Sequence, residues 1–177
     1  MEKDVRTMRS IEVPFQQWIH IVRNEYDYEG KDIEYENDGF AHIIGNTFQY
    51  AVECRYDFIP FVKQFISSDV FRYFGRNFSM YSQSPYHILA SFDSEMIGQK
   101  IRPIHLELEQ SEYMEVAYWL GYFLMKWSLT EGISGEELAQ KYDIGWLIEQ
   151  YQKGDFRKYS IHKSIQATRA KFDFKVL

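Results

Sequence analysis

The stretch that decides the fold runs from Ser111 to Glu131 and reads SEYMEVAYWLGYFLMKWSLTE. Apolar side chains recur along it at helical spacing and cover a broad face, made of Val116, Ala117, Leu120, Phe123, Leu124 and Trp127. Glycine costs about 1 kcal/mol relative to alanine inside a helix, so Gly121 predicts that another element packs closely there. Gly132 directly after the stretch is typical of a helix C-terminus. We therefore expect a long central helix.

Further helical patterns lie on both sides of this stretch. Helices are predicted from Pro14 through Tyr26, from Asp57 toward Phe74, from Ser84 through Phe92, from Ser134 through Tyr142, from Trp146 through Tyr151 and from Ser160 to about Phe172. Ser84 is expected to cap its helix, and Ser134 with Glu137 forms a capping-box pattern. Gly75 and Gly154 would end two of these helices.

Two segments carry a strand-like alternation. Phe40–Tyr56 alternates apolar and polar residues around a potential Gly45-Asn46 turn, which favours a hairpin. Ile104–Glu109 alternates more clearly. The first segment also fits one helical face, formed by Ile44, Phe48, Ala51 and Val52. The predicted fold class is therefore mainly α, or α+β with a small antiparallel sheet, in a single compact domain over residues 1–177.

Composition indicates a cytoplasmic protein without a cofactor. The chain has 177 residues, of which 18% are aromatic, enough for one well-filled core. Cys54 is the only cysteine, so neither an intrachain disulfide nor a cysteine-based zinc site is possible. The longest apolar stretch, Val116–Met125, is too short to span a bilayer.

Charge is divided between an acidic body and a basic C-terminal region. Residues 153–177 carry seven Lys/Arg and two Asp/Glu, a local +5, and the net charge of −6 therefore leaves −11 for the rest. The acidic segment, Glu25–Asp38, is the candidate partner-binding region through Glu25, Asp27, Glu29, Asp32, Glu34, Glu36 and Asp38. Such a body repels nucleic acid, except through the basic region, and suits a basic protein partner. The segment could equally be a solvated loop, or the two regions could pair with each other.

One pattern offers candidate metal ligands. His105, Glu107 and Glu109 would lie along one face of a strand, and imidazole with carboxylates suits a divalent transition metal. A second ligating element is not evident, so a solvated strand face also explains the pattern.

Another pattern offers candidate catalytic residues. Arg157 and His162 resemble the Arg-x(4–6)-His motif of the helical HEPN ribonucleases. The resemblance implies that the histidine acts as general acid/base and the arginine stabilises phosphate charge. Lys158 stands where that motif often has Asn or Asp, and an exposed basic helix start would give the same pattern.

The segment from Ser134 to Tyr151 can also be interpreted as a helix-turn-helix DNA-binding unit. Its second helix offers Glu149, Gln150 and large aromatic residues rather than the basic side chains that contact phosphates. Packing of two ordinary helices explains the pattern better.

Two blocks resemble small uncharacterised bacterial proteins encoded beside toxin–antitoxin modules. They are residues 58–74 and residues 112–127, the second followed by Ser134 to Leu138. The aromatic helix of the second block contains Tyr118, Trp119, Gly121 and Trp127. The resemblance covers about half of the chain and implies an antitoxin-like, partner-binding role.

The favoured hypothesis is a non-catalytic interaction protein that inhibits or regulates a basic macromolecule, such as a toxin or a nuclease. A related version is an anti-defence inhibitor of a nuclease that imitates the charge of a nucleic acid. A helical ribonuclease and a DNA-binding regulator are the competing hypotheses. The sequence does not predict an oligomeric state.

Overall fold

The computed structural model describes Pro14, residues 33–74 and residues 83–173, and helices dominate these ranges. The elements are α3 (Ile33–Glu53), α4 (Phe58–Ile66), α5 (Asp69–Phe74), α6 (Pro85–Gly98), the 3-10 helix η2 (Ser111–Tyr113), α7 (Met114–Glu131), α8 (Gly135–Lys141), α9 (Ile144–Gln152), α10 (Asp155–Lys158) and α11 (Ile161–Phe172). The described β pairing consists of isolated bridges, Pro14 with Ser160 and Tyr56 with His105. The mainly α class is confirmed, and the small sheet that the sequence also allowed does not form within these ranges.

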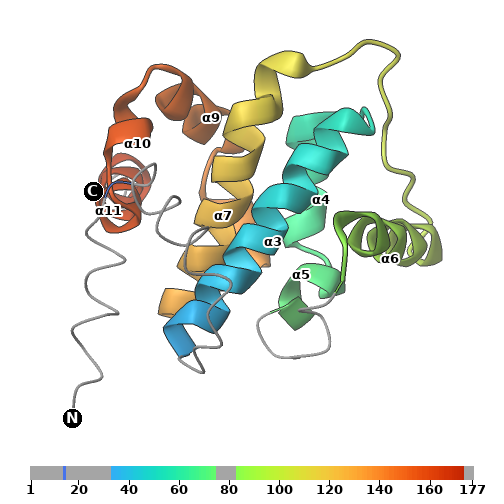
Figure 1. Cartoon of the computed structure of the whole chain (residues 1–177), viewed down its shortest axis with the longest axis horizontal. Coiled ribbons are helices and arrows are strands. Elements are labelled where there is room, and N and C mark those ends of the chain that lie inside the picture. Colours follow the sequence, from blue (N-terminus) through green and yellow to red (C-terminus); the bar gives the residue numbers. More distant parts are fainter. Residues whose placement is uncertain (1–13, 15–32, 75–82, 174–177) are drawn as a thin grey trace.

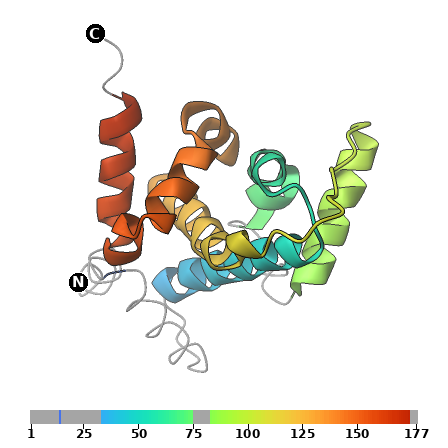
Figure 2. The ribbon, with the colours of Figure 1, turned by 90° about the horizontal axis from the view of Figure 1, so that it is seen from above.

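Helices α3 and α7 lie side by side at the centre and form the most extensive helix pair (Figures 1 and 2). Two glycines bring their backbones together. A Cβ atom on Gly121 would lie 2.7 Å from the carbonyl oxygen of Ile44, and one on Gly45 would lie 2.8 Å from that of Tyr118. Because only glycine leaves room for this approach, the close packing predicted at Gly121 is confirmed.

The remaining helices surround this pair. Helix α6 lies at one end of the long axis and α11 at the other, with α4, α5 and α8–α10 between them (Figures 1 and 2). Aromatic rings fill the core in two clusters. The first contains Phe48, Phe58, Phe61, Phe65 and Phe92, and the second contains Trp119, Phe123, Trp127, Tyr142, Tyr151 and Phe156.

Of the two interpretations of Phe40–Tyr56, the helix is confirmed and the favoured hairpin is wrong, because most of this segment belongs to α3. Its apolar residues share one buried helical face: Phe40, Ala41, Ile44, Phe48, Ala51 and Val52. Gly45 sits inside the helix at the close approach to α7 rather than in a turn. Helix α3 also begins at Ile33, so the end of the acidic segment is helical and does not belong to a solvated loop.

The strand predicted over Ile104–Glu109 is also wrong. The segment touches residues 54–57 through one bridge and two backbone hydrogen bonds, from Asp57 N–H to Ile104 O (2.7 Å) and from Leu106 N–H to Arg55 O (2.7 Å). A strand needs a ladder of such bonds to a neighbouring strand, and here the neighbour is a short connection between two helices.

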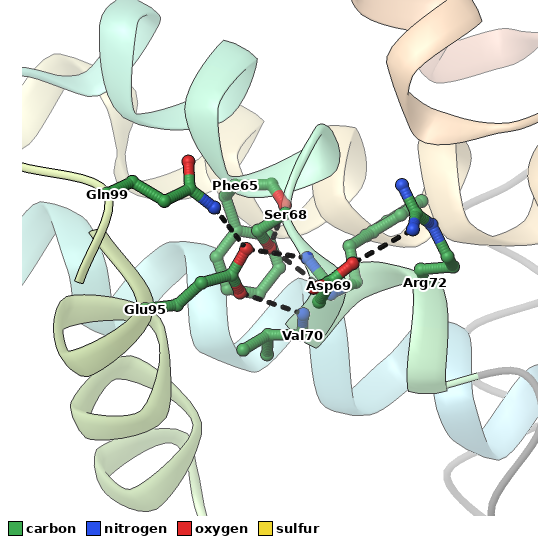
Figure 3. A network of polar contacts seen from close by, with 8 residues as sticks. Phe65, Ser68, Asp69, Val70, Arg72, Glu95 and Gln99 are labelled. Carbon is green, nitrogen blue, oxygen red and sulfur yellow. Dashed lines mark hydrogen bonds and ion pairs between the residues drawn. The ribbon is translucent and has the colours of Figure 1, made fainter. Parts of the chain in front are cut away.

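The helix predicted from Asp57 toward Phe74 is interrupted between α4 and α5. Ser68 turns the chain, since its hydroxyl donates to Phe65 O (2.5 Å) and accepts from Phe71 N–H (3.3 Å). The Glu95 carboxylate of α6 then accepts the free N–H groups of Asp69 (2.9 Å) and Val70 (3.2 Å), as Figure 3 shows. These acceptors satisfy donors that a new helix N-terminus leaves open.

Several predicted helix ends are confirmed. The Ser84, Ser134 and Ser160 side chains each accept a backbone N–H three residues on. Gly132 ends α7 in the left-handed conformation, with φ of 67°. Helix α9 starts earlier than predicted because Asp143 caps it through Trp146 N–H (3.2 Å). The helix predicted from Pro14 through Tyr26 lies outside the described residues, apart from Pro14 itself.

No helix in the described ranges combines the length and the apolar character needed to cross a bilayer.

Candidate functional site

Cations of the basic C-terminal region contact carboxylates of the helical body. Arg169 pairs with Glu131 of α7 (3.2 Å for the longer of two contacts), and Lys153 pairs with Glu149 of α9. Lys163 instead lies 4.0 Å from the centre of the Tyr159 ring. These cations are therefore engaged by side chains outside the acidic segment.

Arg157, the first candidate of the ribonuclease motif, is also engaged. Its guanidinium lies 3.4 Å from a carboxylate oxygen of Glu115 and 5.0 Å from the centre of the Tyr151 ring. The Tyr151 hydroxyl donates to the same carboxylate (3.1 Å), and burial, followed by the nearby Glu115 charge, raises the pKa of Tyr151. This triad joins α7, α9 and α10.

His162, the second candidate, lies on the exposed side of α11, where its Nε2 is 2.8 Å from Gln166 Nε2. Within the described part of the chain, His162 and Arg157 share no hydrogen bond or ion pair. The motif's two residues thus have separate local partners.

The three candidate metal ligands do not converge. His105 Nδ1 lies 3.0 Å from the Cys54 carbonyl, and Glu109 makes a 3.6 Å pair with Arg55. Glu107 contributes its backbone carbonyl, which accepts from Arg55. No group of three potential metal-ligating side chains is present among the described residues.

The acidic segment is described only at its end. Its side chains from Glu25 through Glu36 lie outside the described residues, so their partner-binding role stays a prediction. Asp38 is described and is 1% exposed, so it does not belong to an accessible acidic surface.

Asp38 belongs instead to a set of polar side chains between the central helices, which we call the α3–α7 polar seam: Asp38 and His42 of α3 with Tyr118, Tyr122 and Lys126 of α7. Lys126, also 1% exposed, donates to Asp38 (2.5 Å), and Tyr122 donates to the same oxygen (3.0 Å). His42 hydrogen-bonds to Tyr118.

The seam contains groups able to transfer protons, but its buried ion pair is closed to solvent in this structure. Buried pairs of this kind are best known for fixing the register of packed helices, and we interpret the seam in that way. No pattern in the sequence predicted this seam. A signal was available, because a lysine between Met125 and Trp127 in an apolar helix calls for a buried anion, but nothing local identifies Asp38.

The helix-turn-helix interpretation places DNA contacts on α9. In the structure, α9 buries Ile144, Leu147, Ile148 and Tyr151. Its exposed Glu149 pairs with Lys153 (2.5 Å). The exposed face of α9 therefore carries little of the positive charge that groove binding needs.

A cavity of about 230 Å³ lies between the α4–α5 turn and the α7–α8 turn. Four serines line it, and three of their hydroxyls have a partner in the fold. Ser68 bonds to Phe65 and Phe71, Ser128 donates to Ile133 O, and Ser134 caps α8. These three hydroxyls therefore stabilise the two turns.

Large apolar side chains are exposed where α6 ends and the chain returns to α7. We call this set the 97–108 strip; it consists of Ile97 (66% exposed), Ile101 (39%), Ile104 (56%) and Leu108 (80%). In Figure 1 this connection follows the outer edge of the molecule beside α6, at the end opposite α11. Isolated exposed apolar residues are ordinary, but four within twelve residues of chain form a candidate contact surface.

No family model, curated protein or solved structure matches this chain. Fold and site define a mainly α-helical protein with a polar seam in its core and an exposed apolar strip at one end. The resemblance to proteins encoded beside toxin–antitoxin modules stays a prediction.

Proposed function

We propose that this chain is a non-catalytic, acidic helical protein that binds a basic macromolecular partner, such as a toxin or a nuclease, and inhibits or regulates it. The observation that carries the proposal is where three of the C-terminal cations lie. Lys153, Arg157 and Arg169 are held against Glu149, Glu115 and Glu131, none of which belongs to the acidic segment.

This arrangement has two consequences for a partner. Cations already paired with carboxylates offer less positive charge to a phosphate backbone. By sequence, the acidic segment has six acids against Lys31 between Glu25 and Glu36, and such an excess attracts a basic surface. Attraction of this kind accelerates encounter and selects partners by charge.

The test begins with co-purification from cells that express the protein, with mass spectrometry to identify the partner, and continues with titration of the purified pair. Replacing Glu29, Asp32, Glu34 and Glu36 by their amides should weaken binding about tenfold or more, with a weaker salt dependence than the native protein shows. The matched control replaces Glu53, Glu112, Glu136 and Glu137, all exposed, by glutamine, which changes the net charge equally.

The two variants separate a local contact from a general charge effect. The proposal requires the control to bind nearly as tightly as the native chain. Equal weakening in both variants, or none in the first, would remove the acidic segment from the interface. If the partner is a nuclease and charge mimicry is the mechanism, preloading it with nucleic acid should block the complex.

A further inference from the structure

The 97–108 strip is held in a defined conformation by the body of the protein. Beyond the two backbone hydrogen bonds to residues 55 and 57, Ile101 N–H donates to Met96 O (2.8 Å) and Lys100 adopts a left-handed φ of 61°. The apolar side chains are thus exposed on an ordered segment. A partner that docks there does not have to order it, which removes one of the usual penalties of association.

Charges at the two ends of the strip have opposite sign. Lys100 and Arg102 lie near its start, and Glu107 and Glu109 lie at its end. In the described part of the chain, the side chains of Lys100, Arg102 and Glu107 have no ion pair, while Glu109 has only the exposed 3.6 Å contact with Arg55. Exposed pairs of that kind contribute about 0–1 kcal/mol, so Glu109 remains available.

A surface with exposed apolar side chains along its length, cations near its start and carboxylates near its end is complementary to a copy of itself turned by 180°. We propose that the strip is the contact between two copies of this chain related by a twofold axis. The axis passes near Ile104, so Lys100 and Arg102 of one copy face Glu107 and Glu109 of the other, and Ile101 meets Leu108. Twofold dimers are the commonest protein oligomers, and they require this kind of self-complementary surface.

Charge reversal tests this arrangement directly in the full-length protein. Sedimentation velocity over a range of concentrations should show a dimer for the native chain. Lys100→Glu with Arg102→Glu makes both ends acidic, and Glu107→Lys with Glu109→Lys makes both ends basic. Each variant alone should dissociate, with a dimer dissociation constant raised about tenfold or more.

The decisive sample is an equimolar mixture of the two variants. Acidic ends then face basic ends at both contacts, so the mixture should form a heterodimer although neither variant dimerises. A chain with all four reversals should dimerise again. Circular dichroism confirms that each variant is folded, and Leu108→Asp, at the most exposed position, provides a second test because it should also dissociate the dimer.

Several results would overturn the proposal. A native chain that stays monomeric at about 100 μM, a concentration at which even a weak specific dimer is populated, contradicts it. A dimer unaffected by the reversals and by Leu108→Asp uses another surface. A monomer whose strip binds a different protein assigns the strip to that protein. These outcomes leave the acidic-segment proposal untouched, because its titration does not depend on self-association.

Discussion

Replacing Gly121 by alanine tests the central packing of the fold. The added Cβ would lie 2.7 Å from the Ile44 carbonyl oxygen, 2.9 Å from its carbonyl carbon and 3.0 Å from the Gly45 Cα. All three are backbone atoms of α3, so no side chain can rotate away. The substitution therefore has to push α3 and α7 apart along the most extensive helix pair in the structure.

The size of the effect follows from two opposing contributions. Overpacking a core costs about 1–3 kcal/mol, and contact with rigid backbone places this site near the upper value. Alanine gains up to about 1 kcal/mol over glycine inside a helix. The free energy of unfolding should therefore fall by about 2 kcal/mol, which lowers the Tm of a domain of this size by roughly 4–8 °C.

Gly98 provides the matched control. It is the last residue of α6, and a Cβ there would meet nothing within 4 Å. Gly98→Ala should consequently stabilise the protein by about 0.5 kcal/mol. Urea unfolding followed by circular dichroism measures both variants. The reasoning is refuted if Gly121→Ala proves as stable as the native chain, or if both substitutions change stability in the same direction.

Three further predictions concern polar contacts of the core and its edges. Lys126→Met should destabilise the protein by about 3–5 kcal/mol because the Asp38 carboxylate stays buried without its ammonium partner, and adding Asp38→Leu should restore much of that loss in urea unfolding. Glu95→Ala should lower the free energy of unfolding by about 1–2 kcal/mol because the α5 N-terminus loses its acceptor. Glu95→Gln keeps one side-chain oxygen as an acceptor and should lower it less. Thermal melts that do not separate the two variants would contradict this contact. Burial, with the hydrogen bond to Asp93, raises the pKa of Tyr56 above its ordinary value of 10.0. The unfolded chain therefore releases that proton first, and the stability of the fold should decline as the pH rises above about 10. Tyr56→Phe should flatten this decline in thermal melts recorded between about pH 8 and pH 11.

Predictions from local sequence succeeded where a single segment contains the whole signal. The spacing of apolar residues in Ser111–Glu131 predicts one broad helical face, and the structure has that helix with Gly132 as its cap. Ser84 and Ser134 identify helix starts because a cap involves only the next three residues. Gly121 also indicated that another element packs closely, although not which one.

Local patterns failed where the outcome depends on a distant partner. Phe40–Tyr56 fits a strand and a helix about equally well, and only the surface of α7, which receives Ile44 and Gly45, decides for the helix. The Ile104–Glu109 alternation fits a strand, but the neighbouring segment in the fold is the connection between α3 and α4 and not a strand.

The same distinction between local and distant partners applies to the charged and exposed residues. Sequence alone determined the helical character of the chain, its aromatic core, and its charge division, because these depend on composition and on neighbours within a few residues. Only the tertiary structure decided that Asp38 is buried beside Lys126 and that Arg157 lies against Glu115. It also decided that four apolar side chains beside α6 stay exposed. An ion pair across 88 positions of sequence, or a face left uncovered, is set by how helices pack, and no local pattern contains that information.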